Sequence, residues 1–222
     1  MEGDELRSAY ERRLGGDAPA RQRIWGTLCS CFFQKYVPSD AKVLDIGAGF
    51  CEFINNIRAA QKTAVDLNPD TRRMAAADVS VVTSPATDLS RIGDSSIDVV
   101  FSSNLLEHLP RPDIVKALNE MRRVLKPGGQ LLLMVPNIRY CSRDYWMFFD
   151  HVTPLDDRAL VEVLELNGFR VEEDIPRFLP YTTKSRLPKA PLLVKLYLRL
   201  RFLWTIFGQQ AFIRAQKAGK DA

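Results

Sequence analysis

The feature of this sequence that most constrains its fold is a short apolar run that ends at two closely spaced glycines. Residues 42–46 read Lys-Val-Leu-Asp-Ile, and Gly47-Ala48-Gly49 follow directly. A β-branched apolar run of this length predicts a buried strand, and the glycines predict a sharp turn whose backbone can approach a ligand closely. We expect a helix over residues 50–60, and a helix N-terminus favours negative groups. This order of elements predicts a ligand-binding turn in an α/β fold.

Strands and helices alternate along the rest of the chain. Further strands are expected at 63–67, 79–83, 97–102, 130–135, 169–175 and 209–216, and further helices at 24–36, 68–77, 114–125 and 156–166. Alternation at this spacing predicts βαβ units and a parallel sheet.

The net charge of +4 on the 222-residue chain is unevenly distributed. Residues 184–222 hold nine basic residues and one acid, a net +8, and the remainder carries −4. Hydrophobic residues make up 46% and charged residues 26%, which excludes a wholly disordered chain. We therefore expect a mildly acidic body with a basic segment near its C-terminal end.

These patterns divide the chain into four parts. The expected parts are an N-terminal helical lid (1–40), a ligand-binding core (41–176), a basic apolar cap insert (177–208), and a final strand with a tail (209–222). Within the insert, residues 190–207 combine Leu and aromatic residues with Lys and Arg. That pattern is typical either of a cap on the sheet or of a helix that meets anionic lipid or a polyprenyl-phosphate substrate.

Cysteine and histidine usage argues against a disulfide framework and against a metal site. There are four cysteines, and the two histidines lie far apart in the sequence. No basic start followed by an apolar run opens the sequence, and no apolar run reaches the ~18 residues of a membrane span. We expect no metal, a reduced cytoplasmic compartment and at least three buried thiols, with Cys29 and Cys31 in the core. Peripheral contact with the inner membrane face through residues 190–207 stays open.

An acid at the end of the second expected strand narrows the ligand class. Asp66 lies 19 residues after Gly47, where a carboxylate can accept hydrogen bonds from both hydroxyls of an adenosine ribose. The dinucleotide fingerprint requires a small residue where Glu52 stands, and a glutamate there would repel phosphate. An adenosine ligand without phosphate therefore fits better than NAD or FAD, and Asp45 suits a cationic amino group. That combination points to S-adenosylmethionine.

From about residue 43 to residue 175 the chain resembles the class I S-adenosylmethionine-dependent methyltransferases. Six motifs in the family's order carry the resemblance: Val43-Leu-Asp-Ile-Gly-Ala-Gly49, Ala64-Val-Asp-Leu-Asn-Pro69, Ile97-Asp-Val-Val-Phe-Ser102, Asn104-Leu-Leu-Glu-His-Leu109, Arg123-Val-Leu-Lys-Pro-Gly-Gly129 and Asn167-Gly-Phe169. The resemblance implies an enzyme with S-adenosyl-L-methionine as its cofactor. It also implies a Rossmann-like, doubly wound α/β sheet of about seven strands, mostly parallel with an antiparallel last strand.

The resemblance further implies which residues bind the methyl donor. They belong to the glycine turn, the end of the second strand and the loops after the third and fourth strands: Asp45, Gly47, Ala48, Gly49, Asp66, Leu67, Ala86, Asp88, Ser103 and Asn104. Two departures from the family matter. Cys51 replaces a common third glycine, and Pro85 stands where many members have an acid that binds the adenine amino group. Asp88 or the backbone at Ala86 is expected to take that role.

Methyl transfer from a sulfonium mainly requires alignment of donor and acceptor, and a hydroxyl acceptor also needs help in losing its proton. The expected catalytic residues are His108, after the fourth strand, and His151, after the aromatic run 145–149. Asp150 and Tyr140 are further candidates, although Asp150 is also typical of a turn or cap. Either histidine is alternatively a structural residue bonded to nearby backbone groups.

We expect a biosynthetic methyltransferase that acts at oxygen or nitrogen of a small-molecule or glycan-type acceptor. Residues 145–151, 177–184 and 208–209 resemble a bacterial group associated with glycan and secondary-metabolite pathways, which implies a sugar or lipid-linked acceptor. An RNA-modifying methyltransferase is an alternative, since the basic tail can contact phosphates. Nucleic acid is disfavoured because Asn104-Leu-Leu-Glu stands where base-amino methyltransferases have Asn-Pro-Pro-aromatic. A binding module without chemistry is the other alternative.

Overall fold

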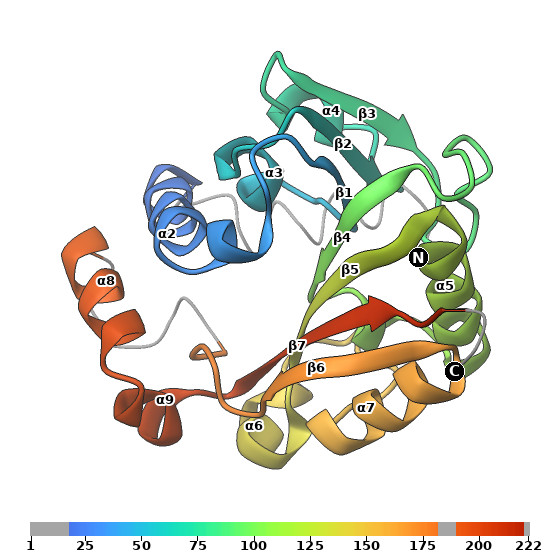
Figure 1. Ribbon diagram of the computed structural model, residues 1–222. Coiled ribbons are helices and arrows are strands. Elements are labelled where there is room, and N and C mark those ends of the chain that lie inside the picture. The colour runs from blue at the N-terminus through green and yellow to red at the C-terminus, as the bar shows by residue number, and fades with distance from the viewer. Residues whose placement is uncertain (1–17, 182–189, 220–222) are drawn as a thin grey trace.

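The computed structural model describes residues 18–181 and 190–219 and has a seven-stranded sheet at its centre (Figure 1). The strands are β1 Lys42–Ile46, β2 Gln61–Asp66, β3 Val79–Thr83, β4 Ile97–Ser103, β5 Leu125–Pro136, β6 Phe169–Ile175 and β7 Gln210–Lys217. Their order across the sheet is β3-β2-β1-β4-β5-β7-β6. The first five strands run parallel, and β7 runs antiparallel to both of its neighbours. The expected Rossmann-like sheet is confirmed.

The strand order reverses between β1 and β4, which fixes where a ligand can bind. β2 and β3 continue on one side of β1, and β5 continues on the other side of β4. Ile46 pairs with Ser102, so both strands end at the same edge of the sheet. In open α/β sheets the loops at the carboxyl ends of the strands diverge at such a point and leave a crevice.

Two helices cover one face of the sheet, α5 (Arg111–Val124) and α7 (Asp157–Leu166) (Figure 1). The buried residues of α5 include Ile114, Leu118 and Met121, which recur at helical spacing and pack into an aliphatic core. This face therefore forms by ordinary amphipathic helix packing.

The opposite face is covered by elements from both ends of the described chain: α2 (Ala18–Cys31), η2 (Phe33–Tyr36), α3 (Glu52–Asn56), α8 (Pro191–Arg199) and α9 (Phe202–Phe207). Its core is aromatic. Phe178 has ring contacts with Phe32, Phe33, Trp204 and Phe212. This cluster joins the start of η2, the insert and β7.

Three short elements lie at the carboxyl edge of the sheet: α4 (Thr71–Met74) after β2, η3 (Leu106–His108) after β4, and α6 (Ile138–Tyr145) after β5. α6 lies in a segment for which the sequence predicted no helix. Its local signal is Asn137, whose side chain accepts the Arg139 N–H as an N-cap.

Several expected boundaries are wrong for identifiable reasons. The helix expected over 50–60 spans only α3, because Cys51 has a left-handed φ of 57° and Ile57 is already extended. β5 begins at Leu125 instead of Gln130, because Leu125 pairs with Ile97 across an irregularity in β4.

The four thiols are only partly as expected. Cys29, Cys51 and Cys141 are buried, but Cys31 is exposed because it ends α2 on the solvent side.

The four-part division of the chain and the lid role of residues 1–40 stay predictions, and residues 1–17 lie outside the described part. Within the described ranges, no helix is both long enough and apolar enough to cross a bilayer.

Candidate active site

The glycine turn after β1 uses its backbone N–H groups within the protein. Gly47 and Gly49 have positive φ values of 72° and 50°, which glycine adopts at low cost. The N–H groups of Gly47 and Ala48 both donate to the Val65 carbonyl, at 2.8 and 3.2 Å. The Gly49 N–H donates to Oδ2 of Asp66 at 2.7 Å. A phosphate-binding turn points such groups at its ligand, so this turn is not built to cradle a pyrophosphate.

The turn is tightly packed against the loop after β4. A Cβ added at Gly47 would lie 3.1 Å from both δ-carbons of Leu105. Cys51, at the position of the family's third glycine, is fully buried and keeps the left-handed backbone conformation that glycine would adopt easily. The path of the turn is therefore preserved without the third glycine.

Asp66, at the end of β2, is arranged to accept further hydrogen bonds. Its Oδ2 accepts the Gly49 N–H and its Oδ1 accepts the Asn68 N–H, both at 2.7 Å. Each carboxylate oxygen keeps a second lone pair, which suits the two hydroxyls of a ribose. Burial raises the pKa of Asp66, and the backbone hydrogen bonds oppose that rise. Leu67 follows with half of its side chain exposed, as a flat apolar surface for a purine would require.

Asp45 adds a second buried acid beside Asp66. Burial and the neighbouring Asp66 charge hold the pKa of Asp45 well above its ordinary value. Glu52 also lies near, and its carboxylate pairs with Arg21 of α2. The crevice therefore has two acids, Asp45 and Asp66, whose charged forms a cationic ligand would stabilise.

These residues fit S-adenosylmethionine on three grounds. The ligand carries a sulfonium and an ammonium group, which the two buried acids favour. It has a ribose for Asp66 and an adenine for Leu67. It has no phosphate, and the N–H groups of residues 47–49 are already used.

The loop after β4 brings Ser103 and Asn104 to the same edge. Asn104 has a left-handed φ of 52°, and its backbone N–H donates to the Met134 carbonyl at 2.9 Å. Its amide donates to Ser103 Oγ at 3.3 Å. The expected place of both residues on the sulfonium side of the donor stays a prediction.

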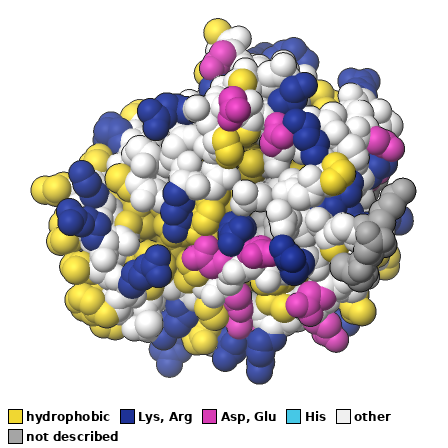
Figure 2. All heavy atoms as spheres, viewed as in Figure 1, with side chains coloured by type: hydrophobic (Ala, Val, Ile, Leu, Met, Phe, Trp, Pro, Cys, Tyr) yellow, Lys and Arg dark blue, Asp and Glu magenta, His cyan; other side chains and the backbone are white. Residues whose placement is uncertain are grey.

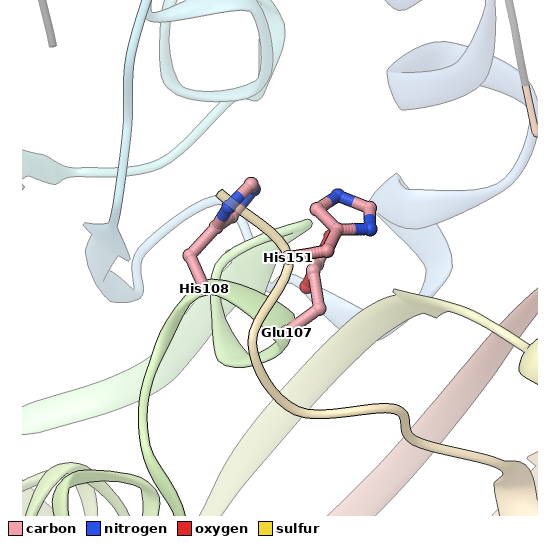
Figure 3. A group of neighbouring side chains, drawn as sticks. All are labelled: Glu107, His108 and His151. Carbon is pink, nitrogen blue, oxygen red and sulfur yellow. The ribbon is translucent and has the colours of Figure 1, made fainter. Parts of the chain in front are cut away.

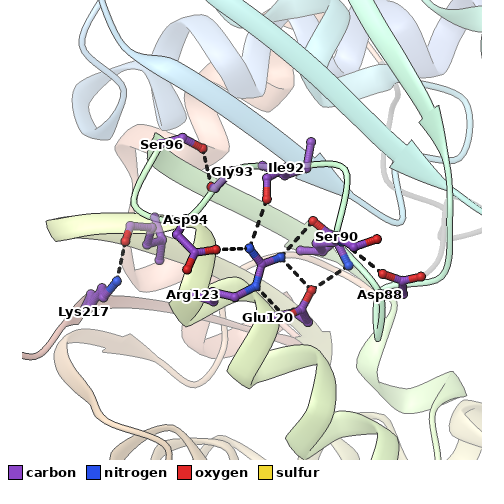
Figure 4. Close-up of polar contacts among 11 residues, drawn as sticks. Asp88, Ser90, Ile92, Gly93, Asp94, Ser96, Glu120, Arg123 and Lys217 are labelled. Carbon is purple, nitrogen blue, oxygen red and sulfur yellow. Dashed lines mark hydrogen bonds and ion pairs between the residues drawn. The ribbon is translucent and has the colours of Figure 1, made fainter.

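The loop after β3 is held by Arg123 of α5 (Figure 4). The guanidinium donates to the carbonyls of Leu89 and Ile92 and pairs with Asp94 and Glu120. Arg123 thereby holds residues 89–94, which follow closely on Ala86 and Asp88, the two residues expected to meet the adenine.

The two predicted adenine residues differ in exposure. Ala86 is buried. Asp88 is exposed, and its Oδ1 accepts the Ser90 N–H at 3.0 Å, which closes a turn. An adenine role for Asp88 stays a prediction.

The fold brings the two histidines together at the carboxyl edge, although 43 positions separate them in the sequence (Figure 3). Their ring centroids lie 4.8 Å apart. Nδ1 of His108 lies 3.1 Å from the carbonyl oxygen and 3.3 Å from Oδ2 of Asp150. Since both partners are acceptors, Nδ1 carries the proton, and Nε2 of the neutral ring keeps its lone pair. The expectation of no metal relied on the distance between the two histidines in the sequence, and the fold removes that distance.

The surroundings of the two rings differ. His151 is buried, with ring contacts to Tyr145 and Phe148, and the Tyr181 hydroxyl lies 3.5 Å from its Nε2. Burial lowers the pKa of His108, but the hydrogen bond to Asp150 and the nearby acidic charges raise it more, so the net shift is upward. The Tyr140 ring lies instead under the guanidinium groups of two arginines, Arg139 and Arg177.

Glu107 is the residue of this region that sequence reasoning missed. Its side chain is fully buried, and burial raises its pKa to about 7. Among the described residues neither carboxylate oxygen has a hydrogen-bond partner. Its carbonyl accepts the N–H groups of Val152 and Thr153, which fastens the His151 loop to η3. An acid directly before a candidate histidine was the only local signal.

A comparison with protein families finds a methyltransferase domain at residues 44–133. Among curated proteins, a sequence from Mycobacterium leprae described as an uncharacterized methyltransferase is 34% identical over 97 residues. That alignment covers 41% of this chain and 35% of the relative, so the chain spans about a third of the relative's length.

Solved structures match over most of the chain. A Haloferax volcanii protein, described as a putative methyltransferase in complex with the Trm112 methyltransferase activator, has a TM-score of 0.68 at 18% identity. The match covers 95% of this chain and 97% of that one. The N-methyltransferase NodS from Bradyrhizobium japonicum, solved with S-adenosyl-L-homocysteine, has a TM-score of 0.59 at 14% identity, covering 95% and 91% of the two chains. At these identities the likeness concerns the fold.

Proposed function

We propose a reaction for this chain, which belongs through the domain at residues 44–133 to the class I S-adenosylmethionine-dependent methyltransferases. It transfers the methyl group of S-adenosylmethionine to an oxygen or nitrogen of a small-molecule or glycan-type acceptor. The observation that carries the proposal is the carboxyl edge of the sheet beside β1, which has two buried acids and a turn whose N–H groups are already used. This combination suits a cationic nucleoside better than a dinucleotide.

The acceptor is placed, in this proposal, between the donor and the two histidines. η3 follows Ser103 and Asn104 directly, so His108 lies at the same edge of the sheet as the expected sulfonium side. An acceptor hydroxyl or ammonium group must lose a proton as it is methylated, and the paired imidazoles are the groups available to assist. A biosynthetic role in the cytoplasm is part of the same proposal.

Donor binding tests the site assignment. Asp66→Ala removes the carboxylate expected to hold the ribose, and we expect on the order of tenfold or greater loss of S-adenosylmethionine affinity by calorimetry. Asp113→Ala, at an exposed position on α5, is the matched control and should bind as the unaltered chain does. Unchanged affinity in Asp66→Ala contradicts the assignment, and absent binding by the unaltered chain contradicts the function.

The acceptor class is tested with a labelled methyl donor against sugar, lipid-linked and small phenolic acceptors. An RNA substrate belongs in the same screen, because the Haloferax protein is described with the Trm112 activator. Two leucines follow Asn104 where base-amino methyltransferases have prolines, so we expect no transfer to RNA. Label in RNA and in no other acceptor would replace the proposed acceptor class.

We also propose that α8 and α9 contact an anionic lipid surface. The exposed side chains on these helices include Leu192, Leu196, Phe202 and Ile206. Lys195, Arg199 and Arg201 lie among them, and the described residues between 176 and 219 contain no acid. Figure 2 shows hydrophobic and basic side chains together along the edge where Figure 1 places α8. Apolar side chains with a basic surround are typical of helices that bind anionic bilayers.

Vesicle flotation tests this contact. We expect the full chain to float with vesicles that contain phosphatidylglycerol and to sediment with pure phosphatidylcholine. Leu196→Gln with Phe202→Gln should abolish flotation, while Leu166→Gln, at an exposed position on α7, serves as the control. Equal flotation of all variants, or none with the unaltered chain, contradicts the proposal.

A further inference from the structure

Both histidines of the chain lie beside one fully buried carboxylate. One ligand atom each from Glu107, His108 and His151 lie within 4.8 Å of one another (Figure 3). The first two residues belong to η3, and the third lies on the loop that η3 fastens through the Glu107 carbonyl. η3 and the loop fastened to it therefore position all three groups.

We propose that Glu107, His108 and His151 form a binding site for a divalent metal ion of the zinc class. Two imidazole nitrogens and one carboxylate oxygen are ligands that Zn²⁺, Co²⁺ and Mn²⁺ accept readily. Mg²⁺ and Ca²⁺ prefer oxygen ligands throughout and fit this set less well.

The state of Glu107 is the first argument for the site. Its side chain is fully buried, and neither oxygen has a hydrogen-bond partner among the described residues. A buried carboxylate is costly unless it is paired or coordinates a metal, and buried unsatisfied groups in native proteins often mark an ion. A cation between Glu107 and the imidazoles would remove this cost.

The support behind His108 is the second argument. The Asp150 carbonyl and carboxylate hold Nδ1, so the lone pair of the neutral ring is on Nε2. A carboxylate behind a histidine is the arrangement that orients imidazole ligands in metal sites and raises their basicity. His151 is packed between the rings of Tyr145 and Phe148, which restrict its movement.

The separation of the ligand atoms allows closure around an ion. Metal–ligand bonds of about 2.0–2.2 Å require neighbouring ligand atoms about 3–3.5 Å apart. In the structure the three ligand atoms lie within 4.8 Å of one another. Small side-chain rotations can shorten these distances to the values that a bound ion requires. Three protein ligands leave at least one position open, as catalytic zinc sites do.

The open coordination position could bind the acceptor, and this role rests on the proposed function. An acceptor hydroxyl bound there would lose its proton to solvent more easily, because the cation lowers its pKa. The oxygen then forms a bond to the methyl carbon while the carbon–sulfur bond breaks, and S-adenosylhomocysteine leaves with the electron pair. The acceptor is therefore an oxygen nucleophile.

The small number of histidines makes a direct test available. In a Cys31→Ser background, which removes the exposed thiol, the full chain is titrated with Zn²⁺ and the two imidazoles are followed by nitrogen-15 NMR. We expect both imidazole signals to shift together to a single end point. Co²⁺ titration should give visible absorption bands of a nitrogen- and oxygen-ligated ion.

Variants separate this site from incidental binding. Glu107→Gln should weaken Co²⁺ binding on the order of 10–100-fold or more, whereas Glu165→Gln, at an exposed position on α7, should leave it unchanged. If Glu107→Gln does not fold, His151→Gln replaces it. Imidazole signals that saturating Zn²⁺ does not move, or equal Co²⁺ affinity in a folded ligand variant, overturns the proposal.

Methyl transfer after chelation separates the two proposals. Metal binding without S-adenosylmethionine binding counts against the proposed function and leaves the metal site standing. If the chain transfers methyl groups and binds no added Zn²⁺ or Co²⁺ after chelation, the metal site is overturned and the proposed function stands.

Discussion

At the scale of single residues, Asp45 of the proposed donor site is expected to lower the stability of the fold. Its pKa lies well above the ordinary carboxyl value because of burial and the nearby Asp66 charge. Asp45→Asn removes a buried charge and can still accept a hydrogen bond from the Ile54 N–H. We expect it to raise the free energy of unfolding without ligand by about 1–3 kcal/mol and to weaken donor binding. Chemical denaturation and calorimetry measure the two effects.

The same residue predicts a pH dependence with a definite sign. A carboxyl whose pKa is raised in the folded state stabilises the fold at low pH, and this contribution is lost as pH rises through the folded-state pKa. The stability advantage of Asp45→Asn should therefore be larger at about pH 8 than at about pH 5. Asp98→Asn is the control, and its expected change in stability has the opposite sign. Burial raises the pKa of Asp98, but pairing with Lys126 lowers it more, so this variant should lose stability.

At the scale of elements, an enclosed ion pair is among the contacts that attach α2 to α3. The Arg21 and Glu52 side chains are only 6% and 15% exposed. Arg21→Gln leaves Glu52 largely buried without its partner, and we expect a loss of about 3 kcal/mol in urea unfolding. Arg21→Gln with Glu52→Gln should lose clearly less than the sum of the two single variants, since neither unpaired charge remains. Additive losses would show that the pair does not couple the helices.

The elements also show what could be predicted from the sequence. β1, β3 and β6 have the expected bounds because their signals are local: apolar or alternating runs between turn residues. The helix after the glycine turn was overestimated, because its limits depend on the left-handed Cys51 and on the extended Ile57. The sequence predicts that the glycine turn and Asp66 lie close together, because both follow from strands whose carboxyl ends meet at one edge of the sheet. Glu107 was not predicted as a site residue, because its environment includes a loop that lies far away in the sequence and carries Val152 and Thr153.

At the scale of the whole molecule, Phe178 joins parts of the chain that are far apart in the sequence. It is fully buried and meets the rings of Phe32, Trp204 and Phe212. We expect Phe178→Ala to cost about 3–5 kcal/mol in the free energy of unfolding and to increase hydrogen exchange in α2 and α9 together. Phe149→Ala, at a side chain that is 99% exposed, should change stability by less than about 0.5 kcal/mol. Increased exchange confined to α9 would contradict the joint role.

The position of β7 between β5 and β6 has a consequence for biosynthesis on the ribosome. Among the described strands, β6 pairs with β7 alone, although β6 is synthesised first, so β6 has no place in the sheet until β7 emerges. Until then the nascent chain presents β5 as an open edge, ready to pair with another polypeptide. A ribosome that stalls before residue 210 would therefore hold an aggregation-prone intermediate, and we expect chaperones to bind this intermediate.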